Sequence, residues 1–137
     1  MVAITITYEG DLHCEAVHGP SGATLATDAP KDNHGKGEQF SPTDLVATAL
    51  GACILTVMGI AARTLGVDLR GAQVSAQKEM VATPQRRIGK IAVVVRIPVT
   101  VTEEQKQKLE HAAMTCPVHK SLHPDIQMPV EFIWGNQ

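Results

Sequence analysis

The sequence predicts an α+β fold in which antiparallel β-sheet is combined with two main helices, the central one buried. Stretches of alternating apolar and polar residues, typical of strands, flank a run from Leu45 to Ala62 that contains no charged residue. A second, amphipathic helical pattern comes later in the chain. No glycine-rich phosphate loop joins a strand to a helix, which excludes a doubly wound nucleotide-binding fold.

Three short strands are expected before the first helix. Residues 2–8 and 12–17 alternate apolar and polar side chains, and Gly10-Asp11 between them is a two-residue turn, so the two segments form a β-hairpin. The turn sequence Gly19-Pro20-Ser21-Gly22 leads into a third strand near residues 23–27. In the hairpin, the alternation predicts that Cys14 belongs to the core.

A polar loop from Asp28 to Gln39 precedes the central helix, and its length is typical of a lid or the rim of a site. Ser41 caps the helix and Asp44 completes a capping box. Arg63 in the last turn and Gly66 beyond it mark the end. The uncharged run is long enough to cross a membrane, but its threonines, alanines and glycines favour a helix buried all round in a soluble protein.

Two long strands follow, over residues 74–80 and 91–101, joined by a turn near Thr83-Pro84-Gln85. Thr102 caps the second helix. The pair Cys116-Pro117 interrupts that helix, because proline has no N–H to donate to the preceding turn. The pattern ends in a last strand, in which apolar residues alternate from Ile126 to Trp134.

Composition limits the function. A chain of 137 residues is most simply one domain, and its formal net charge of −2 gives no basic field for nucleic acid. The N-terminus lacks the charged start and cleavage site of a signal peptide, so we expect a cytoplasmic protein. Three widely spaced cysteines do not form a secreted disulfide framework, and any disulfide here would be transient and functional.

Two of these cysteines are candidates for sulfur chemistry. Cys53 lies in the middle of the uncharged helix, where a thiol usually behaves as a small inert hydrophobe, so a function requires a second reactive group beside it. Cys116, directly before Pro117, is the candidate for that group. His119 is three residues further on and shares a face with Cys116 if the turn continues. A functional pair and simple core packing both remain open from the residues alone.

Three motifs give the chain a resemblance to a known family. They are Ser41-Pro42-Thr43-Asp44-Leu45, Leu50-Gly51-Ala52-Cys53 and Cys116-Pro117-Val118-His119-Lys120-Ser121-Leu122. With the order of elements, they resemble the OsmC/Ohr superfamily of osmotically induced and organic hydroperoxide resistance proteins. The resemblance implies a single OsmC-like domain over residues 1–137, an intertwined homodimer with the central helices in a shared core, and cofactor-free reduction of organic hydroperoxides in oxidative-stress defence.

By the same resemblance, Cys53 is the peroxidatic thiol, Cys116 is the resolving thiol, and an external dithiol restores both. In well-understood members an arginine of the N-terminal sheet and a glutamate near the helix start ionise the thiol. Here the first arginine is Arg63, and Thr43 occupies the glutamate position. Other residues must activate the thiol or bind substrate, and the candidates are His119, Glu38, Asp44, His34 and Lys36.

Two alternatives from other classes remain. Without the arginine, the chain could be a non-catalytic module that binds a small apolar or thiol-bearing ligand at the dimer interface. Cys53, Cys116 and His119 have the donor atoms for zinc, but no closely spaced Cys-x-x-Cys pair accompanies them, and we expect neither a metal nor a cofactor. Turnover of an organic hydroperoxide with a dithiol distinguishes the enzyme from the module.

Overall fold

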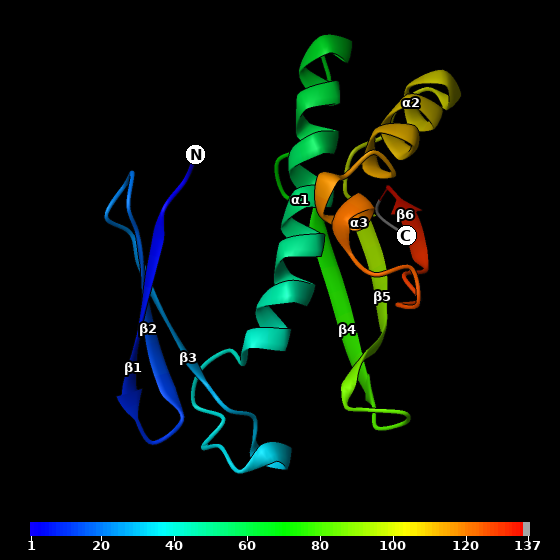
Figure 1. Ribbon diagram of the computed structural model, residues 1–137. Helices are drawn as coiled ribbons and strands as arrows, with labels where there is room; N and C mark the ends of the chain where they lie inside the picture. Colours follow the sequence, from blue (N-terminus) through cyan, green and yellow to red (C-terminus); the bar gives the residue numbers. More distant parts are fainter. Residues whose placement is uncertain (136–137) are drawn as a thin grey trace. The chain divides into compact units, whose positions relative to one another are not determined.

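The first three strands form an antiparallel sheet in the order β1–β2–β3, with β1 at Ile4–Gly10, β2 at His13–His18 and β3 at Thr24–Asp28 (Figure 1). The computed structural model describes residues 1–135. Residues contact one another mainly within two compact units, Met1–Val46 and Ala47–Gln137. The β1–β3 sheet belongs to the first unit. The expectation of one domain over the whole chain stays a prediction.

The hairpin turn differs from the expected one by a single residue. Asp11 and Leu12, not Gly10 and Asp11, occupy the turn, with φ angles of 53° and 61°. Gly10 belongs to β1 and pairs with His13, and the strand register shifts between Tyr8 and Gly10. Gly10 has a φ of 90°, so it absorbs the irregularity at little steric cost. The expectation of a turn at Gly10-Asp11 is therefore wrong.

One face of this sheet is apolar and exposed. Paired residues of antiparallel strands point to the same side, so Ile6, Ala16 and Leu25, which pair in sequence across the three strands, share a face. Ile6 is 62% and Leu25 47% exposed in the described chain. Cys14 pairs with Tyr8 on the same face and is only half-buried, so the expectation that Cys14 belongs to the core is not met within this chain.

The long helix α1 (Pro42–Leu65) begins and ends as the sequence predicts. The Ser41 backbone N–H donates to Asp44 Oδ2 at 2.9 Å, and the Asp44 N–H donates to Ser41 Oγ at 3.0 Å, which is a capping box. At the other end Gly66 adopts a φ of 69°, and the Val67 N–H reaches the Ala62 carbonyl at 2.9 Å. Both predicted boundaries are confirmed.

The second unit contains a three-stranded sheet of β4 (Gln73–Val81), β5 (Arg87–Ile97) and β6 (Val130–Trp134). The β4–β5 pair is antiparallel and β6 pairs with β5 in parallel, so the predicted α+β fold with antiparallel sheet is confirmed, with one parallel pair that the sequence did not predict. The connection from β5 to β6 contains α2 (Glu103–Ala113) and α3 (Pro117–Ser121). This connection returns the chain to the starting end of β5, as a parallel crossover requires.

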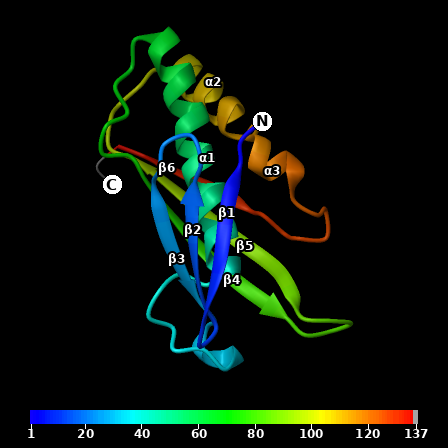
Figure 2. The same cartoon turned by 60° about the vertical axis from the view of Figure 1, so that its left-hand side comes forward.

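Helices and sheet meet in one apolar core. Figure 2 shows α1 running along the sheet with α2 and α3 next to it. A Cβ added at Gly51 would lie 2.9 Å from Val74 Cγ1, so glycine permits the close approach of α1 to β4. The fully buried side chains of this core, all less than 2% exposed, are Leu50, Ile54, Met58, Ile91, Val93, Val95, Ile97, Leu109 and Cys116.

By length and composition α1 could cross a membrane. Leu50, Ile54 and Met58 are, however, fully buried inside the chain, which supports the interpretation of α1 as a core helix. The expectation of a helix buried all round is met along this face only, since Ile60 on the same helix is 63% exposed. A single sheet can cover only one face of a helix that packs on it.

The core assignment predicts the effect of a matched pair of substitutions on α2. Leu109→Ala should lower the free energy of unfolding by about 2–5 kcal/mol, because it leaves a cavity at a position that is 0% exposed. Gln107→Ala, two residues away and exposed, should change it by less than about 0.5 kcal/mol. Urea denaturation measures both values. Equal losses for the two variants would contradict the assignment.

Candidate functional site

Cys116 is held at the start of α3 by the break that the sequence predicts. It is the N-cap residue of α3, with Pro117 in the first position of the helix. The Cys116 sulfur accepts the His119 backbone N–H at 3.4 Å, the role that a serine or aspartate oxygen usually has at this position. The thiol is therefore fixed by a helix cap, and its residue is completely buried.

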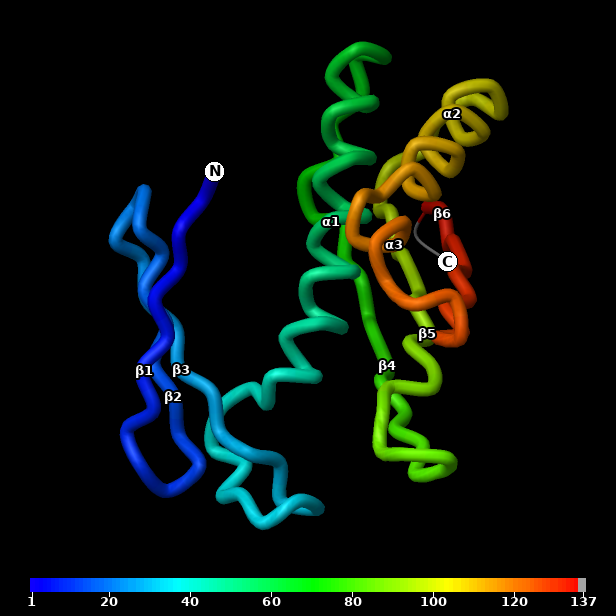
Figure 3. Tube along the Cα trace, viewed as in Figure 1, coloured from blue at the N-terminus to red at the C-terminus, as the bar shows by residue number. Residues whose placement is uncertain are grey.

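Cys53 in the middle of α1 is the partner of this thiol. Cys53 is close enough to Cys116 to raise the pKa of its thiol through a hydrogen bond and through its charge, and Figure 3 shows the start of α3 beside the middle of α1. Both are free thiols, and Cys53 is only half-buried, whereas Cys116 is 0% exposed. The structure thus brings the two predicted cysteines together and makes their access to solvent unequal.

The surroundings of Cys116 favour its protonated form. Burial is the largest cause that raises the pKa of the Cys116 thiol, followed by the hydrogen bond with Cys53 and then the charge of Cys53. The backbone N–H groups of His119 and Val118 act in the opposite direction, because they donate to the sulfur. A protonated Cys116 can donate its S–H to the Cys53 sulfur and so stabilise negative charge there.

His119 lies on the same short helix. Its ring Nδ1 is buried and has no hydrogen-bond partner among residues 1–135. Buried polar atoms are usually satisfied, so an unpartnered one marks the ring as available for a further partner. The ring also lines a hollow of about 530 Å³ whose other walls are Lys120, Leu122, Pro124, Ile126 and Met128.

The remaining candidates lie elsewhere. Asp44 accepts the Ser41 N–H in the capping box. His34, Lys36 and Glu38 belong to the loop after β3, in the unit Met1–Val46, where the short 3₁₀ helix η1 (Lys31–Asn33) ends at a left-handed His34 with φ 70°. The structure therefore groups Cys53, Cys116 and His119 in one unit and the three loop residues in the other.

Sequence reasoning missed one interacting pair. It found no partner for His13, yet His13 Nδ1 lies 2.6 Å from Asp28 Oδ1, and Asp28 is only 5% exposed. The two residues are paired across β2 and β3. The register of β2 against β3 would have revealed the pair, but the sequence pattern places the turn between these strands without assigning which of their residues lie opposite each other.

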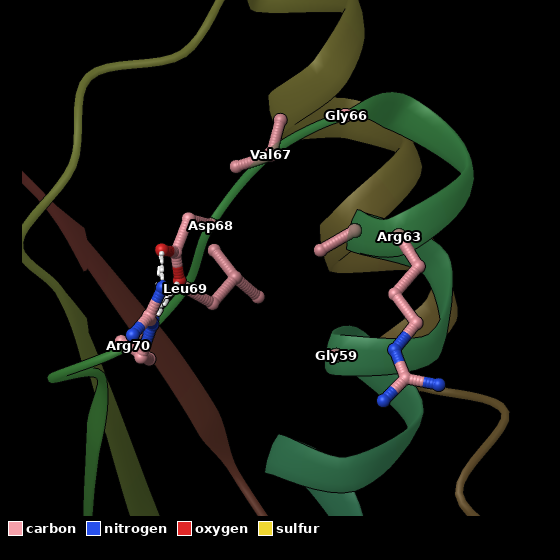
Figure 4. A pocket seen from close by; sticks show the side chains of 8 residues that line it. Gly59, Arg63, Gly66, Val67, Asp68, Leu69 and Arg70 are labelled. Atoms are coloured by element: carbon pink, nitrogen blue, oxygen red, sulfur yellow. Dashed lines mark hydrogen bonds and ion pairs between the residues drawn. The ribbon is translucent and has the colours of Figure 1, made fainter.

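Neither the hollow at the end of α1 nor any metal-binding group of side chains within residues 1–135 extends the site around the two thiols. A hollow of about 620 Å³ at the end of α1, lined by Arg63 and by the Asp68–Arg70 ion pair at 2.9 Å, contains no thiol (Figure 4). Within residues 1–135, no three His, Cys, Asp or Glu side chains are placed to hold a metal ion. The open alternative of a zinc site at Cys53, Cys116 and His119 has no support in this arrangement.

The sequence pattern of the OsmC-like protein family matches residues 35–131, a stretch that contains both cysteine motifs. The chain therefore belongs to the OsmC-like protein family, which confirms the resemblance noted from the sequence. No protein with curated information matches the chain in sequence.

Solved structures agree with this assignment. A protein of Psychrobacter arcticus 273-4, provisionally described as an osmotic stress induced and detoxification response protein, is 42% identical, with a TM-score of 0.91 and 96% of both chains covered. The organic hydroperoxide resistance protein OsmC of Legionella pneumophila is 15% identical, with a TM-score of 0.78 over 97% of this chain and 96% of its own. The corresponding protein OhrB of Bacillus subtilis is 18% identical, with a TM-score of 0.70 over 96% and 97%. The similarity to the last two structures shows that this chain shares their fold.

Proposed function

We propose that the chain is a thiol-dependent peroxidase that reduces organic hydroperoxides in oxidative-stress defence. The single observation that carries the proposal is the contact between Cys53 and Cys116, two free thiols of unequal exposure. Two neighbouring thiols are what a peroxidase needs to convert a sulfenic acid to a disulfide before further oxidation. Family membership and the hydroperoxide resistance proteins among the structural neighbours also support the proposal.

The chemistry can be written with its atoms and electrons balanced. The Cys53 thiolate attacks one peroxide oxygen, the O–O bond breaks, and the leaving alkoxide takes a proton to become the alcohol. Cys53 is then a sulfenic acid. The Cys116 sulfur attacks it, a disulfide forms, and the hydroxyl leaves as water with the Cys116 proton. An external dithiol reduces the disulfide and is itself oxidised, which restores both thiols.

The unequal environments of the two thiols favour this division of roles. Cys53 is half-buried and can be reached by a peroxide, whereas Cys116 is completely buried and its pKa is raised, chiefly by burial. A protected, protonated thiol is a poor first nucleophile but a good second one, because it reacts only with a group already beside it.

His119 is the first candidate for the residue that activates Cys53 or binds substrate. It belongs to the helix that fixes Cys116, and its buried Nδ1 is unpartnered within residues 1–135. The loop residues His34, Lys36 and Glu38 are the second candidates. Asp44 is the least suited, since its carboxylate already accepts a hydrogen bond at the helix cap.

We also propose that the chain forms a homodimer. The β1–β3 sheet exposes an apolar face, with Ile6 at 62% and Tyr8 at 63%, and α1 exposes Ile60 at 63%. Contiguous apolar surface of this kind favours a protein partner, and a second copy would cover both features. The net charge of −2 gives no basic field for nucleic acid, and we propose a cytoplasmic location without a nucleic-acid or membrane partner.

One equivalent of cumene hydroperoxide should convert Cys53 and Cys116 to an intrachain disulfide, and a dithiol should then support turnover. Cys116→Ser should leave Cys53 to proceed to the sulfinic acid, since no resolving thiol remains. Cys14→Ser is the matched control and should behave as the unmodified chain. Peptide mapping by mass spectrometry and peroxide consumption measure these outcomes.

Several outcomes would overturn the peroxidase. If both thiols stay free, or if Cys14 is the partner, the proposed pair is wrong. If a co-purified ligand is found without turnover, the alternative of a binding module replaces the enzyme.

The rate of Cys53 alkylation at neutral pH identifies the activating residue. If His119→Ala slows this alkylation by about tenfold, the consequence of about one unit in thiol pKa, His119 is the activating residue. If only His34→Ala or Lys36→Ala slows it, the loop has that role.

The dimer predicts an apolar interface of more than about 2,000 Å² in total. Ile6→Asp should shift the chain toward the monomer in sedimentation experiments at micromolar concentration, because it places a charge in the apolar face of the β1–β3 sheet. Thr5→Asp, on the opposite face of the same strand, should leave the assembly unchanged. A stable monomer of the unmodified chain at that concentration would contradict the proposal.

A further inference from the structure

A polar cluster near the hairpin turn takes no part in the proposed peroxide chemistry. His13 Nδ1 lies 2.6 Å from Asp28 Oδ1, and His13 Nε2 lies 3.4 Å from Glu9 Oε1. Each ring nitrogen thus faces a carboxylate. This arrangement suits the protonated imidazole, in which both nitrogens are donors. Asp28 is 5% exposed, so the protein, more than the solvent, must satisfy its carboxylate.

The same carboxylate fastens the loop that follows β3. Asp28 Oδ2 accepts the backbone N–H of Glu38 at 3.1 Å, ten residues after Asp28 itself. The Asp28 side chain therefore joins His13 of β2 to the far part of the loop. Backbone hydrogen bonds complete the attachment, from the Asp28 N–H to the Phe40 carbonyl at 3.1 Å and from the Ala29 N–H to the Leu12 carbonyl at 3.1 Å. Asp28 is therefore the central fastening point of the segment 29–40.

We propose that the His13–Asp28 pair is a pH-operated latch that holds the loop 29–40 against the β1–β2 hairpin. The loop leads directly into Ser41, the first residue of the capping box of α1. The order of the segment before the long helix then depends on the charge of a single imidazole. This inference concerns the loop alone and does not depend on the peroxidase.

The groups around His13 explain the direction of its titration. The hydrogen bond with Asp28 is the largest cause that raises the pKa of His13; partial burial acts against it, and the charges of Asp28, Glu9 and Glu15 add to the increase. The neighbours thus include acidic groups of β1, β2 and β3. The pKa of Asp28 is lowered in turn, first by the hydrogen bond with His13 and further by backbone N–H groups of Glu38 and Gln39.

The turn and the loop also contribute charged groups. A hollow of about 200 Å³ is shared by His13, Asp28, Asp11 of the turn, and Lys36 and Glu38 of the loop. Apart from His13, the cationic residue that lines this hollow is Lys36. The carboxylates that line it are more numerous: Glu9, Asp11, Asp28 and Glu38. The surroundings of the imidazole are therefore acidic overall, which agrees with a protonated His13 at the pH where Asp28 is ionised.

The sign of the pH dependence follows from these shifts. His13 has a raised pKa, so its contribution is complete below the ordinary histidine value of 6.5 and is lost as the pH rises through the raised value. Asp28 has a lowered pKa, so its contribution is present above the ordinary value of 3.8 and is lost as the pH falls through the lowered one. The latch is strongest between these two ordinary values and loosens toward alkaline pH.

Amide hydrogen exchange and imidazole NMR of the intact chain test this latch. The protection factors of amides in 29–40, corrected for intrinsic exchange, should fall several-fold between about pH 6 and about pH 9, together with the titration of His13. In His13→Asn, whose amide donates without titrating, loop protection should no longer depend on pH. His18→Asn is the matched control on the same strand, since His18 bonds to Ser21 and not to the loop.

Two results would overturn the latch. One is a His13 pKa at or below the ordinary value in the unmodified chain, a measurement that needs no variant. The other is an unchanged pH dependence of loop protection in His13→Asn. Asp28→Asn gives a further check, because it should lower the pKa of His13 and release the loop at every pH. If His13→Asn does not fold, the pKa of His13 in the unmodified chain and the loop protection in Asp28→Asn still test the proposal.

Discussion

The contact between the thiols of Cys53 and Cys116 is the interaction on which the functional interpretation depends. Two backbone constraints fix it. Gly51 lets α1 approach β4 closely, since a Cβ there would lie 2.9 Å from Val74, and this sets the position of the neighbouring Cys53. Pro117 begins α3 and makes Cys116 its N-cap, which aims the sulfur inward. The pair is therefore held by ordinary helix packing and capping, and both thiols are free.

The sequence predicted the features that short-range rules determine. Ser41 and Asp44 form the expected capping box because they are three residues apart, and the second helix is interrupted before Pro117 as expected, because proline has no N–H to donate to the preceding turn. It also predicted the buried face of β5, where Ile91, Val93, Val95 and Ile97 alternate. These features need only the residues within one turn or one strand.

The features that the sequence did not predict depend on distant parts of the chain. The parallel pairing of β6 with β5 follows from the path taken through α2 and α3, which alternation within a strand cannot reveal. The His13–Asp28 pair depends on the register of β2 against β3. Ile6 alternates like a core residue yet is 62% exposed, because alternation shows which residues share a face and not what covers that face. Local patterns specify elements, whereas partners and directions are tertiary properties.

The central claim is that Cys53 and Cys116 form an unequal pair in which Cys116 stays protonated while Cys53 reacts. Thiolate absorbance followed against pH in a Cys14→Ser background tests it most directly. The account predicts that the thiolate which forms at a raised pKa is lost in Cys116→Ser and kept in Cys53→Ser. It also predicts a lower pKa for Cys116 once Cys53 is removed, though still above the ordinary value, because burial remains. A Cys116 thiol with a pKa at or below the ordinary value in the Cys14→Ser chain would contradict it.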